Sequence, residues 1–274
     1  MGKKSGMRDS EQLRERRMRL EQEAKEKQRR QNRIVYGTLG AFLGLILIAV
    51  LITVIVTQTG KKKGNTETNT ETNPGTTAPT MDQIDLSDVA DASVFTISEN
   101  ETDYVRLTVS YTTSAGTSES GDIYIRLFPD VAPKTVANFK SLVASGFYNG
   151  LTFHRIMPNF MIQGGDPNGN GTGDSGTTIQ GEFTANGFEN NLKHIRGVVS
   201  MARGSQSMDS ASCQFFIMHA DYPSLNGNYA SFGYVVNGMD VVDAITQIEL
   251  VEIDSQTKSP VHPVTITSAV FVTK

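Results

Sequence analysis

Hydrophobic and polar residues alternate strictly along two neighbouring stretches of the chain. Residues 105–109 place Val, Leu and Val at every second position, and residues 123–127 place Ile, Ile and Leu in the same way. A segment rich in Gly, Ser and Thr separates them. Alternation with period two on both sides of a turn segment is typical of a half-buried β-hairpin. We therefore predict two antiparallel strands here.

Two other stretches have the spacing of an α-helix. Residues 132–144 have Pro133 near their start, apolar side chains at helical intervals and Gly146 just after their end, and Gly238–Thr246 has a similar pattern. Several short apolar runs have the length of strands instead. They lie at 197–201, 214–218, 232–236 and 264–272. Many short strands with two helices indicate one mainly β domain with a single core, which we place at residues 91–274.

The N-terminal third has a different pattern, in which Ile34–Val56 is apolar and carries no charge. At 1.5 Å per residue, a helix of this length spans about 35 Å, enough to cross a bilayer core of about 30 Å. A buried core helix or a cleaved signal peptide are the alternatives. Core helices of this length usually keep a polar face, and signal peptides have shorter apolar regions nearer the N-terminus. We predict a single transmembrane helix over residues 34–57.

Charge is distributed unevenly on the two sides of this span. Residues 1–33 carry 12 Lys/Arg and 6 Asp/Glu, a balance of +6, whereas residues 64–274 carry 10 Lys/Arg and 23 Asp/Glu, a balance of −13. Because positive flanks stay in the cytoplasm, we expect residues 1–33 to be a basic cytoplasmic segment. Lys61, Lys62 and Lys63 oppose this orientation weakly. The C-terminal domain would then lie outside the cytoplasm, and we expect a bacterial cell. A flexible linker over residues 58–90, which has few apolar side chains, would connect the domain to the membrane.

The remaining reactive residue types give little sign of other chemistry. The single cysteine, Cys213, allows no intrachain disulfide and precedes an apolar run, so we predict a small buried side chain. The four histidines lack metal-ligand spacing, and we expect no metal, no cofactor and no nucleic-acid partner. The glycine-rich segment Asp166–Gly176 partly matches dinucleotide, serine-protease and calcium motifs. The structural context that each motif needs is missing, so we interpret it as a surface loop of tight turns.

The most informative motif is F-H-R-I-M-P-N-F-M-I-Q-G-G-D at Phe153–Asp166. It is followed by S-M-A-R at Ser200–Arg203 and Q-F-F-I at Gln214–Ile217. Together these motifs resemble the cyclophilin family of peptidyl-prolyl cis/trans isomerases, over roughly Val105–Thr273. The resemblance implies an eight-stranded antiparallel closed barrel capped by two helices, with a monomeric catalytic domain that acts on proline-containing polypeptides.

The chemistry of such an isomerase needs no nucleophile, metal or cofactor. A permanently charged arginine aimed at the prolyl nitrogen would stabilise the lone pair that appears when the amide twists, and Arg155 is our candidate for this role. The resemblance implies further roles for nine residues. The proline pocket would be lined by Phe160, Met161, Phe216 and Leu225, with Tyr229 as an aromatic wall. Gln163 would hydrogen-bond the substrate backbone. The groove for the residues before the proline would be bordered by Ala202, Arg203 and Gln214.

Two departures from the best-known eukaryotic members concern this pocket. Ser224 stands where they have tryptophan, and Tyr229 stands where they have histidine. We therefore expect isomerisation to survive, but cyclosporin-type macrocycles to bind weakly. The leading hypothesis is a membrane-anchored isomerase that assists the folding of secreted or envelope proteins. A proline-binding chaperone or scaffold module with little turnover is the alternative, and a hydrolase is disfavoured because no nucleophile–base pair is visible.

Overall fold

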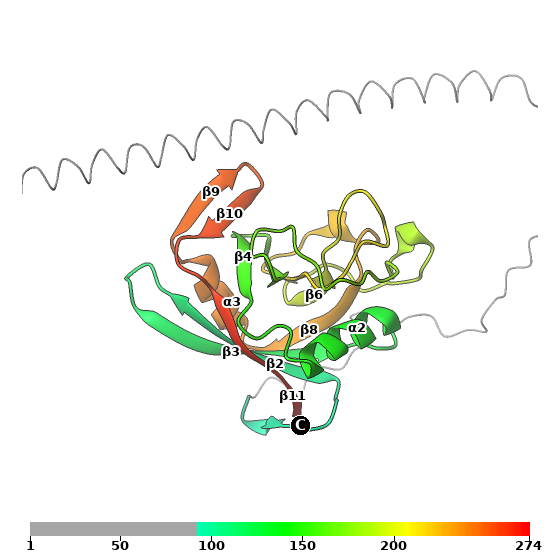
Figure 1. The fold of residues 1–274 in the computed structure, drawn as a ribbon, viewed down its shortest axis with the longest axis horizontal. Coiled ribbons are helices and arrows are strands. Elements are labelled where there is room, and N and C mark those ends of the chain that lie inside the picture. Colours follow the sequence, from blue (N-terminus) through cyan, green and yellow to red (C-terminus); the bar gives the residue numbers. More distant parts are fainter. Residues whose placement is uncertain (1–91) are drawn as a thin grey trace, which may run out of the picture. The chain divides into compact units, whose positions relative to one another are not determined.

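The computed structural model describes residues 92–274 (Figure 1). The predicted cytoplasmic segment, transmembrane helix and linker lie outside these residues. Within 92–274, no helix is long and apolar enough to cross a bilayer. The elements follow in the order η2 (Ala92–Val94), β1 (Thr96–Ile97), β2 (Tyr104–Thr112), β3 (Ser118–Leu127), α2 (Pro133–Ala144), β4 (Thr152–Met157), β5 (Met161–Asp166), η3 (Thr184–Asn186), β6 (Val198–Met201), β7 (Phe215–Met218), η4 (Pro223–Leu225), β8 (Ser231–Asn237), α3 (Met239–Thr246), β9 (Leu250–Asp254), β10 (Thr257–Pro260) and β11 (Thr265–Thr273).

Eight antiparallel strands close into a barrel. They pair in the order β11-β2-β3-β8-β6-β7-β5-β4, and β11 pairs with β4 through Thr265 and Thr152 to complete the ring. The short strand β1 pairs with β11 as a ninth strand outside the ring. The expectation of an eight-stranded antiparallel barrel with two helices is thus confirmed.

The predicted hairpin forms the long β2–β3 pair. Burial alternates at every residue of β2, and Leu107 of β2 lies opposite Ile123 of β3 with both side chains fully buried. Because successive side chains of a strand point to opposite faces, this alternation puts one apolar row into the barrel core. The four predicted apolar runs become β6, β7, β8 and β11.

Both predicted helices are present and pack against the barrel. Helix α2 starts with Pro133 at its first turn and buries Val136, Phe139 and Val143. The Phe139 ring contacts the rings of Tyr148, Phe215 and Phe232, with centroids 5.0–5.5 Å apart. Helix α3 buries its apolar face in the same core.

A distant carboxylate caps the N-terminus of α2. Glu182 is fully buried, and its carboxylate accepts hydrogen bonds from the Lys134 N–H (2.9 Å), the Thr135 N–H (2.8 Å) and the Thr135 hydroxyl (2.7 Å). The first N–H groups of a helix have no partner within the helix, and a negative charge there is favourable. Glu182 therefore ties the loop after the glycine-rich segment to the start of α2.

The hairpin β9–β10 is a feature that the alternation of residues did not predict. Its strands follow α3 and precede β11 in the sequence, and they form a separate two-stranded sheet. Strand β10 runs beside β4 (Figure 1). Val251 and Ile253 on β9 remain about half exposed, at 49% and 48%. Its first strand alternates only over Val251–Asp254, and its second strand has no large apolar residue, so the sequence gives only a short signal for it.

Candidate active site

Three neighbouring strands bring the central polar pair of the candidate site together. Arg155 of β4 lies opposite Gln163 of β5, which lies opposite Phe216 of β7. Side chains directly opposite on adjacent strands share one face of the sheet. The Arg155 Nη1 donates to Gln163 Oε1 at 3.1 Å, so the register itself fixes the guanidinium beside the amide.

Arg155 is half-buried and has a second polar partner on the β9–β10 turn. Its Nε and Nη2 both donate to the main-chain oxygen of Gln256, at 3.1 and 2.7 Å. Burial lowers the pKa of Arg155, and the negative charge of Asp254 opposes this effect. Since the ordinary pKa of arginine lies far above neutral, the guanidinium stays charged at neutral pH.

A cavity of about 170 Å³, most of whose lining residues have apolar or aromatic side chains, opens next to this guanidinium. It is lined by every predicted site residue except Gln214: Arg155, Phe160, Met161, Gln163, Ala202, Arg203, Phe216, Leu225 and Tyr229. Met161 and Phe216 are almost fully buried and form its inner wall. The cavity therefore combines apolar walls with two guanidinium groups, those of Arg155 and Arg203, and the amide of Gln163.

Aromatic and cationic contacts hold the outer wall of this cavity in place. The Tyr229 ring meets Phe216 edge-on, with centroids 5.7 Å apart. The Arg203 guanidinium lies over both the Tyr229 ring (5.0 Å) and the Phe183 ring (5.2 Å). Such cation–π contacts restrict the rings and the arginine together. The side chain of Arg203 is thus part of the wall, in addition to the backbone role expected for this residue.

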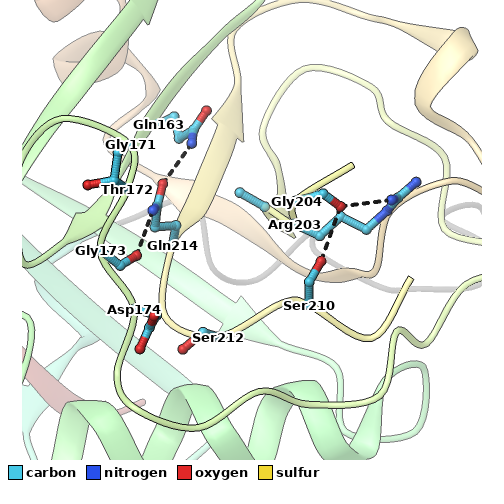
Figure 2. Close-up of a pocket in the computed structure, with 11 residues that line it drawn as sticks. Gln163, Gly171, Thr172, Gly173, Asp174, Arg203, Gly204, Ser210, Ser212 and Gln214 are labelled. Carbon is cyan, nitrogen blue, oxygen red and sulfur yellow. Dashed lines mark hydrogen bonds between the residues drawn. The ribbon is translucent and has the colours of Figure 1, made fainter. Parts of the chain in front are cut away.

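A second cavity of about 270 Å³ adjoins the first, and Figure 2 shows the residues that line it. Gln163, Ala202 and Arg203 line both cavities. The remaining residues of the second cavity come from the glycine-rich loop and the segment before β7: Gly171, Thr172, Gly173, Asp174, Gly204, Ser210, Ser212 and Gln214. Arg155 does not line this larger cavity. The two cavities form adjacent parts of one surface, with Arg155 at one end only and Arg203 shared between them.

Gln214, the predicted residue that falls outside the first cavity, connects the two. Gln163 Nε2 donates to Gln214 Oε1 at 2.9 Å, and Gln214 Nε2 donates to the Gly173 carbonyl at 2.8 Å (Figure 2). Together with the Arg155–Gln163 bond, these contacts form a continuous chain from β4 to the glycine-rich loop. The sequence analysis did not identify Thr172, Asp174 or Ser210, because they lie on loops that have no distinguishing pattern.

The glycine-rich loop is organised by its own aspartate. Asp166 is buried and accepts hydrogen bonds from the N–H groups of Asn168 and Asn170, at 2.8 and 2.9 Å, and from that of Gly171. Burial by itself would raise the pKa of Asp166, but these bonds lower it below the ordinary value. Gly171 adopts a φ of +87°, which favours glycine. The interpretation as a loop of tight turns is confirmed.

The prediction for Cys213, and the surroundings of His154 next to the site, can be compared with the structure. Cys213 is fully buried, and burial raises the pKa of its thiol to about 11, which confirms a packing role over a reactive one. His154, next to Arg155, is buried with both ring nitrogens unbonded, and burial lowers its pKa. Its ring therefore packs as a neutral side chain behind the site.

The closed barrel with two helices, and the apolar cavity beside an arginine, define a cyclophilin-type protein. The family model described as cyclophilin type peptidyl-prolyl cis-trans isomerase/CLD matches residues 108–271, so the chain belongs to this family and is a peptidyl-prolyl cis-trans isomerase.

Individual relatives agree with this assignment. Peptidyl-prolyl cis-trans isomerase CYP18-1 of Arabidopsis thaliana is 44% identical over 130 residues, which cover 47% of this chain and 79% of the relative. Peptidyl-prolyl cis-trans isomerase B of Bacillus subtilis is 44% identical over 122 residues, covering 44% and 81%. The crystal structure of a Cryptosporidium parvum cyclophilin type isomerase superposes with a TM-score of 0.52 at 30% identity, covering 63% of this chain and 98% of that one.

Proposed function

We propose that this isomerase grips the proline ring of a polypeptide in the apolar cavity and uses Arg155 to assist rotation about the preceding peptide bond. The observation that carries the proposal is the guanidinium held at the rim of a cavity with Met161 and Phe216 on its inner wall. The cavity provides the apolar surface, and the cation provides a directed donor beside it.

The barrier to be lowered comes from amide resonance. Rotation about a peptide bond costs about 18–20 kcal/mol, and uncatalysed X–Pro isomerisation takes tens of seconds or more. In the twisted transition state the prolyl nitrogen gains a lone pair that the planar amide lacks. A cationic donor at this nitrogen binds the transition state better than either ground state, which is the requirement for catalysis.

The polar residues beside Arg155 have positions suited to holding the substrate backbone. Gln163 lines both cavities, and its carbonyl oxygen already receives a bond from Arg155. We propose that Gln163 hydrogen-bonds the backbone next to the proline, and that residues preceding the proline lie along Ala202, the backbone of Arg203 and Gln214. The second cavity then accepts a side chain from this preceding segment.

The test of this mechanism is isomerisation of a proline tetrapeptide by the wild type and by Arg155→Ala. Loss of a preorganised donor to the transition state typically costs about 10²–10³-fold in turnover. We expect a loss of this size in kcat with a much smaller change in KM. A matched control is Arg126→Ala, since this arginine belongs to β3 and lines neither cavity. Unchanged turnover in Arg155→Ala would contradict the mechanism and leave only a proline-binding role for the site.

We also propose that the domain is held at the outer face of a bacterial membrane and assists secreted or envelope proteins as they fold. The support is the charge-free run Ile34–Val56 with 12 Lys/Arg before it. Protease added to intact cells or spheroplasts should remove the C-terminal domain while a tag at the N-terminus stays protected. Protection of the C-terminal domain, with recovery of the protein in the soluble fraction, would contradict both the anchor and its orientation.

A further inference from the structure

The catalytic candidate Arg155 is held from two sides, and only one of them belongs to the barrel. Gln163 of β5 accepts a hydrogen bond from Nη1 at 3.1 Å. On the other edge, the Gln256 carbonyl at the β9–β10 turn accepts from both Nε and Nη2, at 3.1 and 2.7 Å. The hairpin therefore makes two of the three hydrogen bonds that connect this guanidinium to oxygen atoms of the described residues.

The turn that presents this carbonyl is shaped by Asp254. The Asp254 Oδ1 accepts a hydrogen bond from the Gln256 N–H at 2.8 Å, a local bond between an aspartate and the residue two positions later. Such bonds fix turn conformations. They do so here at an exposed site, where β9 and β10 pair only with each other. Without the Asp254 carboxylate, nothing else recorded in the structure holds the Gln256 N–H.

The hairpin is also joined to the barrel next to Arg155. The Ser259 hydroxyl on β10 donates to the main-chain oxygen of His154 at 3.1 Å. This bond places β10 beside β4, one residue away from the arginine. The Asp254 charge also favours the cationic form of Arg155, opposing the effect of burial. The Ser259 bond thus holds the hairpin next to Arg155, and the Asp254 charge acts on the Arg155 guanidinium.

We propose that the β9–β10 turn is a positioning device for Arg155, with Asp254 as the residue that holds the Gln256 carbonyl in place. This inference rests on the proposed catalytic role of Arg155. An arginine side chain has several rotatable bonds, and a donor has to be aimed closely to stabilise a transition state. Without the hairpin, the guanidinium would keep one hydrogen bond to oxygen, from Gln163, and only weaker contacts with the Met161 sulfur and the Phe160 ring. Binding of the proline depends on other residues, so the hairpin acts on turnover.

The experiment compares three variants of the full chain in the tetrapeptide isomerisation assay. Asp254→Ala removes both the acceptor and the charge, and we expect kcat to fall roughly tenfold with KM nearly unchanged, as for a misplaced catalytic group. Asp254→Asn keeps an acceptor oxygen for the Gln256 N–H and should recover most of the turnover. Glu252→Ala removes an exposed carboxylate two positions earlier on β9, whose recorded partner is Lys258 at 4.0 Å, and should match the wild type.

A second readout reports on the arginine without turnover. The Nε–Hε resonance of Arg155 in ¹⁵N NMR should be distinct and slow to exchange in the wild type and in Asp254→Asn, and averaged in Asp254→Ala. The inference is overturned if Asp254→Ala keeps the wild-type kcat and the wild-type resonance. It is also overturned if Asp254→Asn is as slow as Asp254→Ala, because the loss of the Asp254 charge alone would then explain the lower turnover. Failure of the catalytic proposal would look different, since Arg155→Ala itself would then keep full turnover.

Discussion

The buried carboxylate of Glu182 allows a quantitative test of the packing that supports the site. Its partners are the Lys134 N–H, the Thr135 N–H and the Thr135 hydroxyl, all at 2.9 Å or less. In Glu182→Gln the amide keeps one acceptor oxygen, but its NH₂ group faces a donor and the charge at the helix N-terminus is lost. Hydrogen bonds to charged groups contribute about 1.5–3 kcal/mol each and do not add fully, so we expect a loss of about 2–4 kcal/mol in unfolding free energy.

This loss should be measurable by thermal unfolding. For domains of 150–250 residues, 1 kcal/mol shifts Tm by about 2–4 °C, which predicts a decrease of roughly 5–15 °C. The matched control is Glu189→Gln, because Glu189 is exposed and bonds only Asn191 among its recorded partners. A decrease below about 2 °C in Glu182→Gln, or an equal decrease in the control, would refute the reasoning that this carboxylate caps α2.

Three further predictions concern other residues. Burial lowers the pKa of His194 to about 4, so between pH 6.5 and 4 the unfolded chain binds a proton that the folded chain does not. Acidification from pH 7 to pH 4.5 should therefore reduce the unfolding free energy by about 2 kcal/mol, and this loss should be absent in His194→Gln. Urea titrations at the two pH values that show the same loss in both proteins would contradict this. Cyclosporin should bind weakly, and Ser224→Trp should tighten it; submicromolar affinity of the wild type, measured by calorimetry, would refute the reasoning. Cys213 is fully buried, so a thiol reagent should modify it only at the rate of unfolding, and rapid labelling of the native protein would contradict its packing.

Elements with one strongly buried face could be predicted from the sequence. The strands β2 and β3 alternate because one row of their side chains fills the core, and α2 has Pro133 and its apolar spacing. The hairpin β9–β10 was missed, because its first strand alternates only over Val251–Asp254 and its second strand, Thr257–Pro260, has no large apolar residue. A pattern this short in one strand and absent from the other does not distinguish a hairpin from a loop.

The candidate site likewise contains residues that could be predicted from the sequence and residues that could not. Arg155, Gln163 and the apolar residues were identified through motifs, and the strand register then brings them to one face. Gln256 contributes a main-chain carbonyl, which every residue type has, so its identity carries no signal. The bond from Gln163 to Gln214 depends on the pairing of β5 with β7, two strands that are 51 positions apart in sequence at this contact.

The place of β11 in the ring has a consequence for biosynthesis. This strand leaves the ribosome or a translocation channel after all the others, yet it lies between β2 and β4. A nascent chain that lacks residues 265–273 has two unpaired strand edges, and such edges can pair with other chains. This isomerase domain is therefore vulnerable to misassembly until β11 emerges and closes the ring.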